Sequence, residues 1–112
     1  MILAHVSAVV DEIAILRCRV KNKGNRTVSW MRKRDLHILT TNIYTYTGDQ
    51  RFSVIHPPGS EDWDLKIDYA QPRDSGVYEC QLTTTFKTLK LRSGFTTQSR
   101  LEQKFLDLRK FM

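Results

Sequence analysis

Apolar and polar residues alternate along the first 82 residues of the chain, and this alternation predicts β-strands rather than helices. Ala14, Leu16, Cys18 and Val20 share one parity, which gives their segment one apolar face. The same period recurs at Val28 and Trp30, at Phe52 and Val54, at Trp63, Leu65 and Ile67, and around Tyr78 and Cys80. Turn-forming residues separate these runs at 23–25, 47–49 and 56–59. Short strands at this spacing predict a β-sandwich or a β-barrel.

Two cysteines, a tryptophan and a tyrosine decide between these architectures. Trp30 follows Cys18 by 12 residues, Cys80 follows Cys18 by 62, and Tyr78 stands two residues before Cys80. The cysteine count alone fits either a disulfide or two buried thiols. The whole combination resembles that of immunoglobulin domains, in which a disulfide joins two sheets, a tryptophan packs on it and a tyrosine corner pins a turn. This resemblance implies a Cys18–Cys80 disulfide, with Trp30 and Tyr78 in the core.

The interval between Trp30 and Asp74 indicates the variable type of immunoglobulin domain. It has room for an extra hairpin at about 35–47 and for two further strands. Arg51 and Asp74 resemble the ion pair that closes one end of such domains, and a solvated strand-end arginine is the alternative. We therefore expect a V-type sandwich of two antiparallel sheets in a Greek key over residues 1–94, with its last strand unassigned, and a basic tail over residues 95–112.

A disulfide requires an oxidising compartment. Closing a loop of this length would contribute about 4 kcal/mol to stability. Asn25 begins an N-glycosylation sequon, Asn25-Arg26-Thr27, in a predicted loop, which makes Asn25 a candidate glycan site. The first six residues lack the basic start and apolar stretch of a signal peptide, and no apolar run nears the ~20 residues of a membrane helix. We expect an extracellular, cell-surface domain whose leader and membrane attachment are not encoded in these residues.

Four stretches of the chain carry a closer resemblance. They are EIAILRCRV at 12–20, TVSWMRKRDLHILT at 27–40, YTYTGDQRF at 44–52 and QPRDSGVYECQ at 71–81. The most specific of them contains RKRDLHIL at 32–39. From about His5 to Gln81 the chain is similar to the first immunoglobulin domain of the Dpr family, neuronal cell-surface proteins of insects. After Gln81 the residues differ from the family's usual last strand, and we expect these 112 residues to hold one immunoglobulin domain where members of the family normally have two.

The resemblance implies a role in recognition. Dpr proteins bind Dpr-interacting proteins, another group of the immunoglobulin superfamily, through the first domains of both partners. This pairing helps neurons choose synaptic partners. We expect the chain to bind such a protein, with a second copy of itself as an alternative partner. An inactive or soluble truncated form is the alternative to a binding role.

Strand parity predicts the binding surface. If Trp30 and Cys80 point inward, their sequence neighbours point out of the same sheet. The next strand and its edge are expected to add a histidine, a leucine and two tyrosines. The candidate partner-binding residues are Met31, Lys33, His37, Leu39, Tyr44, Tyr46, Glu79 and Gln81. Exposed apolar residues on a sheet face indicate binding, and the alternative is that Arg32 and Lys33 simply cover Met31 and Leu39.

The net charge of +6 suggests a polyanion as a rival partner. The excess lies near the C-terminus, because residues 83–112 carry 7 Lys/Arg and 2 Asp/Glu, against 11 and 10 in residues 1–82. A heparan-type chain or a membrane surface would contact Lys87, Lys90, Arg92 and the tail. In the tail, Leu101, Phe105, Leu108 and Met112 share one helical face behind a capping box at Ser99 and Glu102. This pattern fits either a short amphipathic helix or a frayed extension.

The sequence offers no catalytic, cofactor or metal site. It lacks a phosphate-binding glycine loop and a paired nucleophile and base, and both cysteines belong to the expected disulfide. His5, His37 and His56 lack the spacing of metal ligands. Basic and aromatic residues do not interleave as they do in binders of single-stranded nucleic acid. We expect neither an enzyme nor a nucleic-acid-binding protein.

Overall fold

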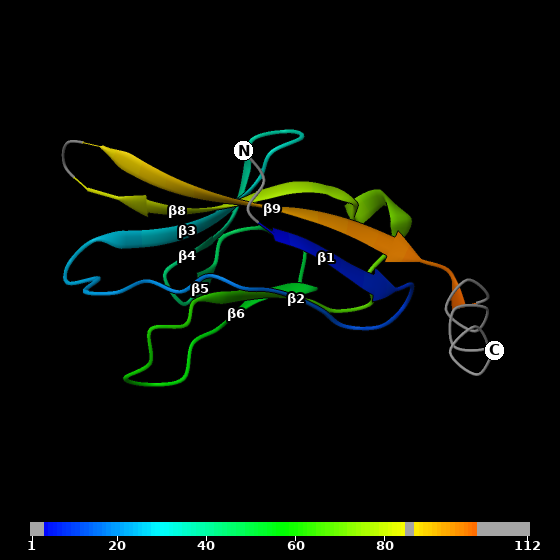
Figure 1. Cartoon of the computed structure of the whole chain (residues 1–112), viewed down its shortest axis with the longest axis horizontal. Coiled ribbons are helices and arrows are strands. Elements are labelled where there is room, and N and C mark those ends of the chain that lie inside the picture. Colours follow the sequence, from blue (N-terminus) through cyan, green and yellow to red (C-terminus); the bar gives the residue numbers. More distant parts are fainter. Residues whose placement is uncertain (1–3, 85–86, 101–112) are drawn as a thin grey trace.

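The computed structural model describes residues 4–84 and 87–100, which form two facing β-sheets (Figure 1). The larger sheet has the order β1 (Ala4–Val9), β9 (Thr88–Gln98), β8 (Gly76–Thr83), β3 (Thr27–Arg32), β4 (His37–Thr41) and β5 (Tyr44–Thr45). The smaller sheet has the order β2 (Ala14–Leu16), β7 (Asp64–Ile67) and β6 (Phe52–Ile55). The V-type sandwich predicted from the sequence is confirmed. One pair departs from the antiparallel pattern, because β1 runs parallel to β9.

The apolar positions that alternate along the sequence meet between the two sheets. Leu16 on β2, Leu65 on β7 and Trp30 on β3 are each at most 1% exposed. Burying a large apolar side chain contributes roughly 1.5–3 kcal/mol. Phe52 on β6 and Phe95 on β9 extend the same core toward one end of the sandwich. The period-2 pattern therefore specifies which side of each strand is buried.

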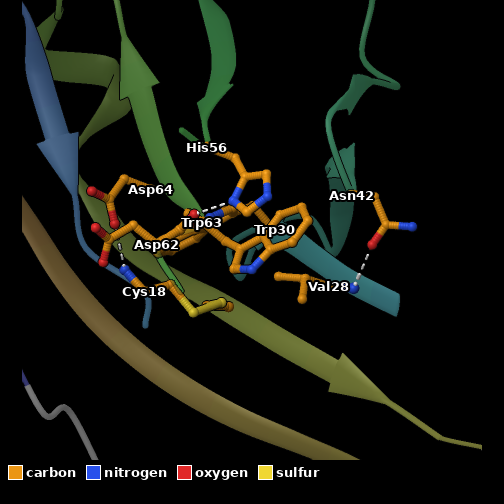
Figure 2. Close-up of a disulfide and its surroundings, with 9 residues drawn as sticks. Cys18, Val28, Trp30, Asn42, His56, Asp62, Trp63 and Asp64 are labelled. Carbon is orange, nitrogen blue, oxygen red and sulfur yellow. Dashed lines mark hydrogen bonds between the residues drawn. A yellow bond between two sulfur atoms is a disulfide. The ribbon is translucent and has the colours of Figure 1, made fainter. Parts of the chain in front are cut away.

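The Cys18–Cys80 disulfide crosses this core and confirms the predicted pairing, with 6.3 Å between the two Cα atoms. The polar groups around it are paired, as Figure 2 shows. The Cys18 amide donates to Asp64 Oδ1 at 2.9 Å, and Trp30 Nε1 donates to the Trp63 carbonyl oxygen at 2.8 Å. Because a buried donor without an acceptor is energetically costly, the bond from Nε1 holds the Trp30 indole in one orientation beside the disulfide.

A short 3-10 turn, η1 (Pro72–Asp74), closes one end of the sandwich ahead of β8. The Tyr78 hydroxyl donates to the Asp74 carbonyl oxygen at 2.6 Å. The Asp74 carboxylate accepts hydrogen bonds from Arg51, which directly precedes β6, and from the Gln71 amide. Burial raises the pKa of Asp74, but the hydrogen bonds from Arg51 and Gln71 outweigh it, so the pKa lies below its usual value. The turn therefore ties the two sheets together.

The last strand is longer than the sequence suggested. β9 pairs with β8 from Gly76 opposite Phe95 to Thr83 opposite Thr88 and continues to Gln98. Phe95 is 1% exposed and meets the Tyr78 ring edge-on, with 6.4 Å between ring centroids. The boundary predicted at residue 94 is therefore placed too early, because residues 95–98 are part of the sheet. The remaining expectation for the tail, a helical face over 101–112, lies outside the described residues.

Within the described ranges, no helix is long and apolar enough to cross a membrane.

Candidate functional site

The outward side of the larger sheet carries two rows of paired side chains. Trp30 and Cys80 lie in the core, so their neighbours on β3 and β8 point away from it. Residues paired across strands share one face of a sheet. One row runs Ile38, Met31, Glu79, Arg92, and the other runs Tyr44, Thr41, Ser29, Gln81, Lys90. We call these nine residues, together with Lys33 at the end of β3, the outer face.

A β-bulge in the β3–β4 pair corrects the prediction for Leu39. Met31 pairs with Ile38, whereas Trp30 pairs with Thr40, so Leu39 is the extra residue between them. Leu39 is 0% exposed and belongs to the hydrophobic core. Counting alternate residues along β4 fails at this point, because a bulge shifts the parity of every residue beyond it. Ile38, which the sequence analysis did not select, occupies the outer face instead.

His37 is also placed away from the outer face. It pairs with Arg32, one residue beyond the Met31–Ile38 pair, and alternation puts it on the other side of β4. A ring nitrogen of His37 lies 3.0 Å from Thr47 Oγ1 in the following loop. The structure thus gives His37 a local bonding role at the end of the sheet.

Met31 and Glu79 lie beneath other side chains at the centre of the outer face. Met31 is 7% exposed and Glu79 is 0% exposed, although both point away from the core. Arg92 Nε donates to Glu79 Oε2 at 2.6 Å, and Gln81 Nε2 donates to Glu79 Oε1 at 3.1 Å. The same Gln81 nitrogen lies 3.7 Å from Met31 Sδ, and Lys33 Nζ lies 3.8 Å from Glu79 Oε2. Met31 is therefore covered by neighbouring side chains and is not an exposed contact residue for a partner.

Glu79 is ionised in this arrangement. Burial raises its pKa, but the hydrogen bonds from Arg92 and Gln81 and the charges of Lys33 and Lys90 outweigh that effect, so its pKa lies below the usual value. A buried carboxylate with this many partners is satisfied and holds its neighbours in place. The centre of the outer face is thus preorganised and polar.

Large apolar side chains are exposed at the β5 side of this sheet. Tyr44 is 72% exposed, and Tyr46, just beyond β5, is 74% exposed. The turns on either side of β4 add Leu36, which is 63% exposed, and Ile43, which is 57% exposed. We call these four residues the apolar edge. Sequence parity found the two tyrosines, but it missed Leu36 and Ile43 because turns have no parity; their signal is a bulky apolar side chain where polar residues are usual.

Lys90 and Arg92 are the other residues that the sequence assigned differently. Their register opposite Gln81 and Glu79 places both on the outer face. The sequence grouped them with Lys87 and the tail because β9 had no assigned register. Asn25 is exposed in the loop before β3, which leaves its side chain accessible.

Side chains that could hold a metal ion do not gather in the part of the chain that the structure describes. Three or more His, Cys, Asp or Glu side chains do not meet there as a metal site requires. Asp64, the first residue of β7, instead pairs with Arg17 and with the Cys18 amide. What the sheet offers is a broad surface with a polar centre and an apolar edge.

A family model described as the immunoglobulin V-set domain matches residues 4–100. The chain belongs to the V-set family. This V-set domain is 30% identical over 84 residues to the Zwei Ig domain protein zig-8 of Caenorhabditis elegans. The match covers 75% of this chain and 31% of the relative, so the chain spans about a third of that protein's length.

Solved structures of similar V-set domains include two bound to partners. The first immunoglobulin domain of Dpr1, bound to that of DIP-eta, is 50% identical with a TM-score of 0.81, and the match covers 84% of this chain and 88% of that one. The first domain of Dpr11, bound to DIP-gamma, is 41% identical with a TM-score of 0.78, and the match covers 85% of this chain and 98% of that one. Both are domains that bind other proteins.

Proposed function

We propose that this V-set domain is a first immunoglobulin domain of the Dpr type that binds another immunoglobulin-superfamily protein through its outer face. The partner would be a Dpr-interacting protein on a neighbouring neuron, and the domain would act outside the cell. The 50% identity to a Dpr1 domain solved in such a complex supports this assignment. The Cys18–Cys80 disulfide agrees with an extracellular location.

The observation that carries the proposal is the apolar edge beside a preorganised polar centre. Leu36, Ile43, Tyr44 and Tyr46 are exposed in the turns at the two ends of β4 and along β5. Large apolar side chains exposed along one side of a sheet favour an interaction site. Tyrosine is enriched in interfaces because it offers a large body with a polar tip. The Glu79 network presents ordered hydrogen-bonding groups on the same sheet, separated from β5 by β3 and β4. An interface of standard size needs roughly 800 Å² from each partner, which one sheet face can supply.

The proposal is for a binding role without catalysis. Recognition by V-set domains of the Dpr type needs complementary surfaces and no reaction chemistry. A glycan on Asn25, in the loop before β3, would be compatible with the proposed extracellular location.

The test is a surface-binding assay of the disulfide-intact domain against a panel of Dpr-interacting ectodomains. Tyr44→Asp would place a charge on the apolar edge, and we expect it to weaken binding at least about tenfold. Tyr69→Asp is the matched control, because Tyr69 is 68% exposed but lies between β7 and η1. Met31→Asp is a poor probe, since Met31 is covered and the change would also destabilise the fold.

Binding by the wild type that Tyr44→Asp loses and Tyr69→Asp keeps would support the proposal. No binding by a demonstrably folded domain, or equal loss in both variants, would refute it. The polyanion alternative is distinguished by salt, because binding to heparin through several cations falls steeply and linearly on a log–log plot of affinity against salt concentration.

A further inference from the structure

Glu79 differs from the other residues of the larger sheet in its charge. Among the strands of that sheet, all within the described residues, Glu79 is the single carboxylate. It is 0% exposed, and both of its carboxylate oxygens already accept hydrogen bonds from within the chain. The outer face therefore presents no free negative charge to anything that docks on it.

The outer face does, in contrast, present positive charge to a docking partner. Lys33 and Arg92 contact Glu79, but their side chains remain 42% and 37% exposed. Lys90, opposite Gln81 on the neighbouring strand, is exposed. Three cations and one anion leave the outer face with an excess of two positive charges. The excess is concentrated toward β9, whereas the apolar edge lies toward β5.

Docking would remove these cations from water. A surface without opposing charge would leave them desolvated and unpaired, which is costly. A second copy of the chain, docked face to face, would bring the same excess of positive charge against them. A surface with carboxylates at this position would instead supply the missing partners and steer the encounter.

We propose that the outer face selects an immunoglobulin-type partner that presents carboxylates opposite Lys90 and Arg92, and that it disfavours face-to-face pairing with a second copy of this chain. This inference rests on the proposed function, and it names the chemistry of the partner. Lys90 is the specificity-determining residue, because it is exposed and pairs across the strands with Gln81 and not with Glu79. The apolar edge supplies contact area, and the cations determine which of the partners that can cover this edge bind tightly.

The test compares two single variants, each of which reverses one positive charge. Lys90→Glu changes the outer face, and Lys66→Glu makes the same change in net charge on β7 of the smaller sheet, where the buried Leu65 and Ile67 on either side of it point into the core. Analytical ultracentrifugation measures the self-association of each domain alone. Surface binding measures its affinity for every immunoglobulin ectodomain that binds the wild type, at low and at physiological salt.

We expect Lys90→Glu to weaken partner binding about tenfold, mainly through slower association, with a larger effect at low salt. We also expect it to self-associate at least about tenfold more tightly than Lys66→Glu, because its new carboxylate can meet Arg92 and Lys33 of a second copy. Lys66→Glu should match the wild type in both measurements.

Equal behaviour of the two variants would overturn the inference, as would face-to-face self-association of the wild type as tight as its partner binding. If no ectodomain binds the wild type, the proposed function fails, and the self-association measurement still decides the charge selection. If only a sulfated polysaccharide binds, and Lys90→Glu loses it, the inference of a protein partner is wrong.

Discussion

Arg51 donates two parallel hydrogen bonds to Asp74, from Nη1 to Oδ2 at 2.7 Å and from Nη2 to Oδ1 at 2.9 Å. The two side chains are 18% and 2% exposed, so the pair is largely removed from solvent. Asp74 belongs to η1 and Arg51 precedes β6, so the pair links the two sheets at one end. This arrangement makes the contribution of Arg51 to folding directly measurable.

We expect Arg51→Ala to lower the free energy of unfolding by about 2–4 kcal/mol, because it leaves the buried Asp74 carboxylate without its main partner. Urea unfolding of the disulfide-intact domain measures this change. Arg19→Ala is the control, since Arg19 and Glu61 form a pair whose side chains are 71% and 38% exposed. Exposed pairs contribute about 0–1 kcal/mol. Similar losses in the two variants would show that burial does not strengthen the Arg51–Asp74 pair.

Acid should destabilise the fold through Glu79. Its pKa in the folded state lies below the usual 4.5, so its contribution to stability is present above that value and is lost as the pH falls through the folded pKa. Glu79→Gln keeps the shape and removes the charge. We expect this variant to be less stable than the wild type at neutral pH, and the difference to shrink at acid pH. Urea midpoints measured across the acid range would contradict this if the two curves ran parallel.

Tyr78 is expected to contribute to the loss of stability at alkaline pH. Burial, followed by the nearby charge of Asp74, raises its pKa to about 12 from the usual 10.0. The corresponding stability is complete below pH 10 and is lost as the pH rises toward the folded pKa. A spectroscopic titration of tyrosinate should show one late component that Tyr78→Phe lacks. The same variant should lose about 1 kcal/mol at neutral pH, because the hydrogen bond to the Asp74 carbonyl oxygen is absent. A titration without a late component would refute the assignment.

Removal of the disulfide should be the most damaging of these changes. The bridge joins residues 62 positions apart, and a loop of that length contributes about 4 kcal/mol by restricting the unfolded chain. We expect the double variant Cys18→Ala, Cys80→Ala to be largely unfolded near body temperature. Circular dichroism during thermal unfolding measures this. A cooperative transition at the wild-type temperature would show that the bridge is dispensable.

The core could be predicted because its signals can be read directly from the order of the residues. The spacing of Cys18, Trp30 and Cys80 is typical of the immunoglobulin sandwich, and all three lie in the core as that spacing implies. The binding face was harder to predict, because the alternation of apolar and polar residues does not show where a bulge occurs. One inserted residue moved Leu39 into the core and brought Ile38 out.

Register explains the other misses. Lys90 and Arg92 became part of the outer face through their pairing with β8, which composition does not encode. The burial of Glu79 depends on Arg92, which reaches over from the neighbouring strand β9, and on Gln81, two residues further along β8. Such contacts between side chains are not encoded in the alternation of apolar and polar residues. The extent of β9 was missed because Gly94 interrupts the alternation just before the buried Phe95.

The parallel pairing of β1 with β9 also determines how the domain responds to mechanical load. Figure 1 shows the two strands side by side. Six residue pairs join them, from Ala4 opposite Ser93 to Val9 opposite Gln98. Tension applied toward the N-terminal end of β1 and the C-terminal end of β9 slides the strands past each other, so all six pairs resist together instead of opening one after another. In the proposed role at a contact between two cells, the domain would thus meet tension in shear, the direction in which this pair of strands is hardest to separate.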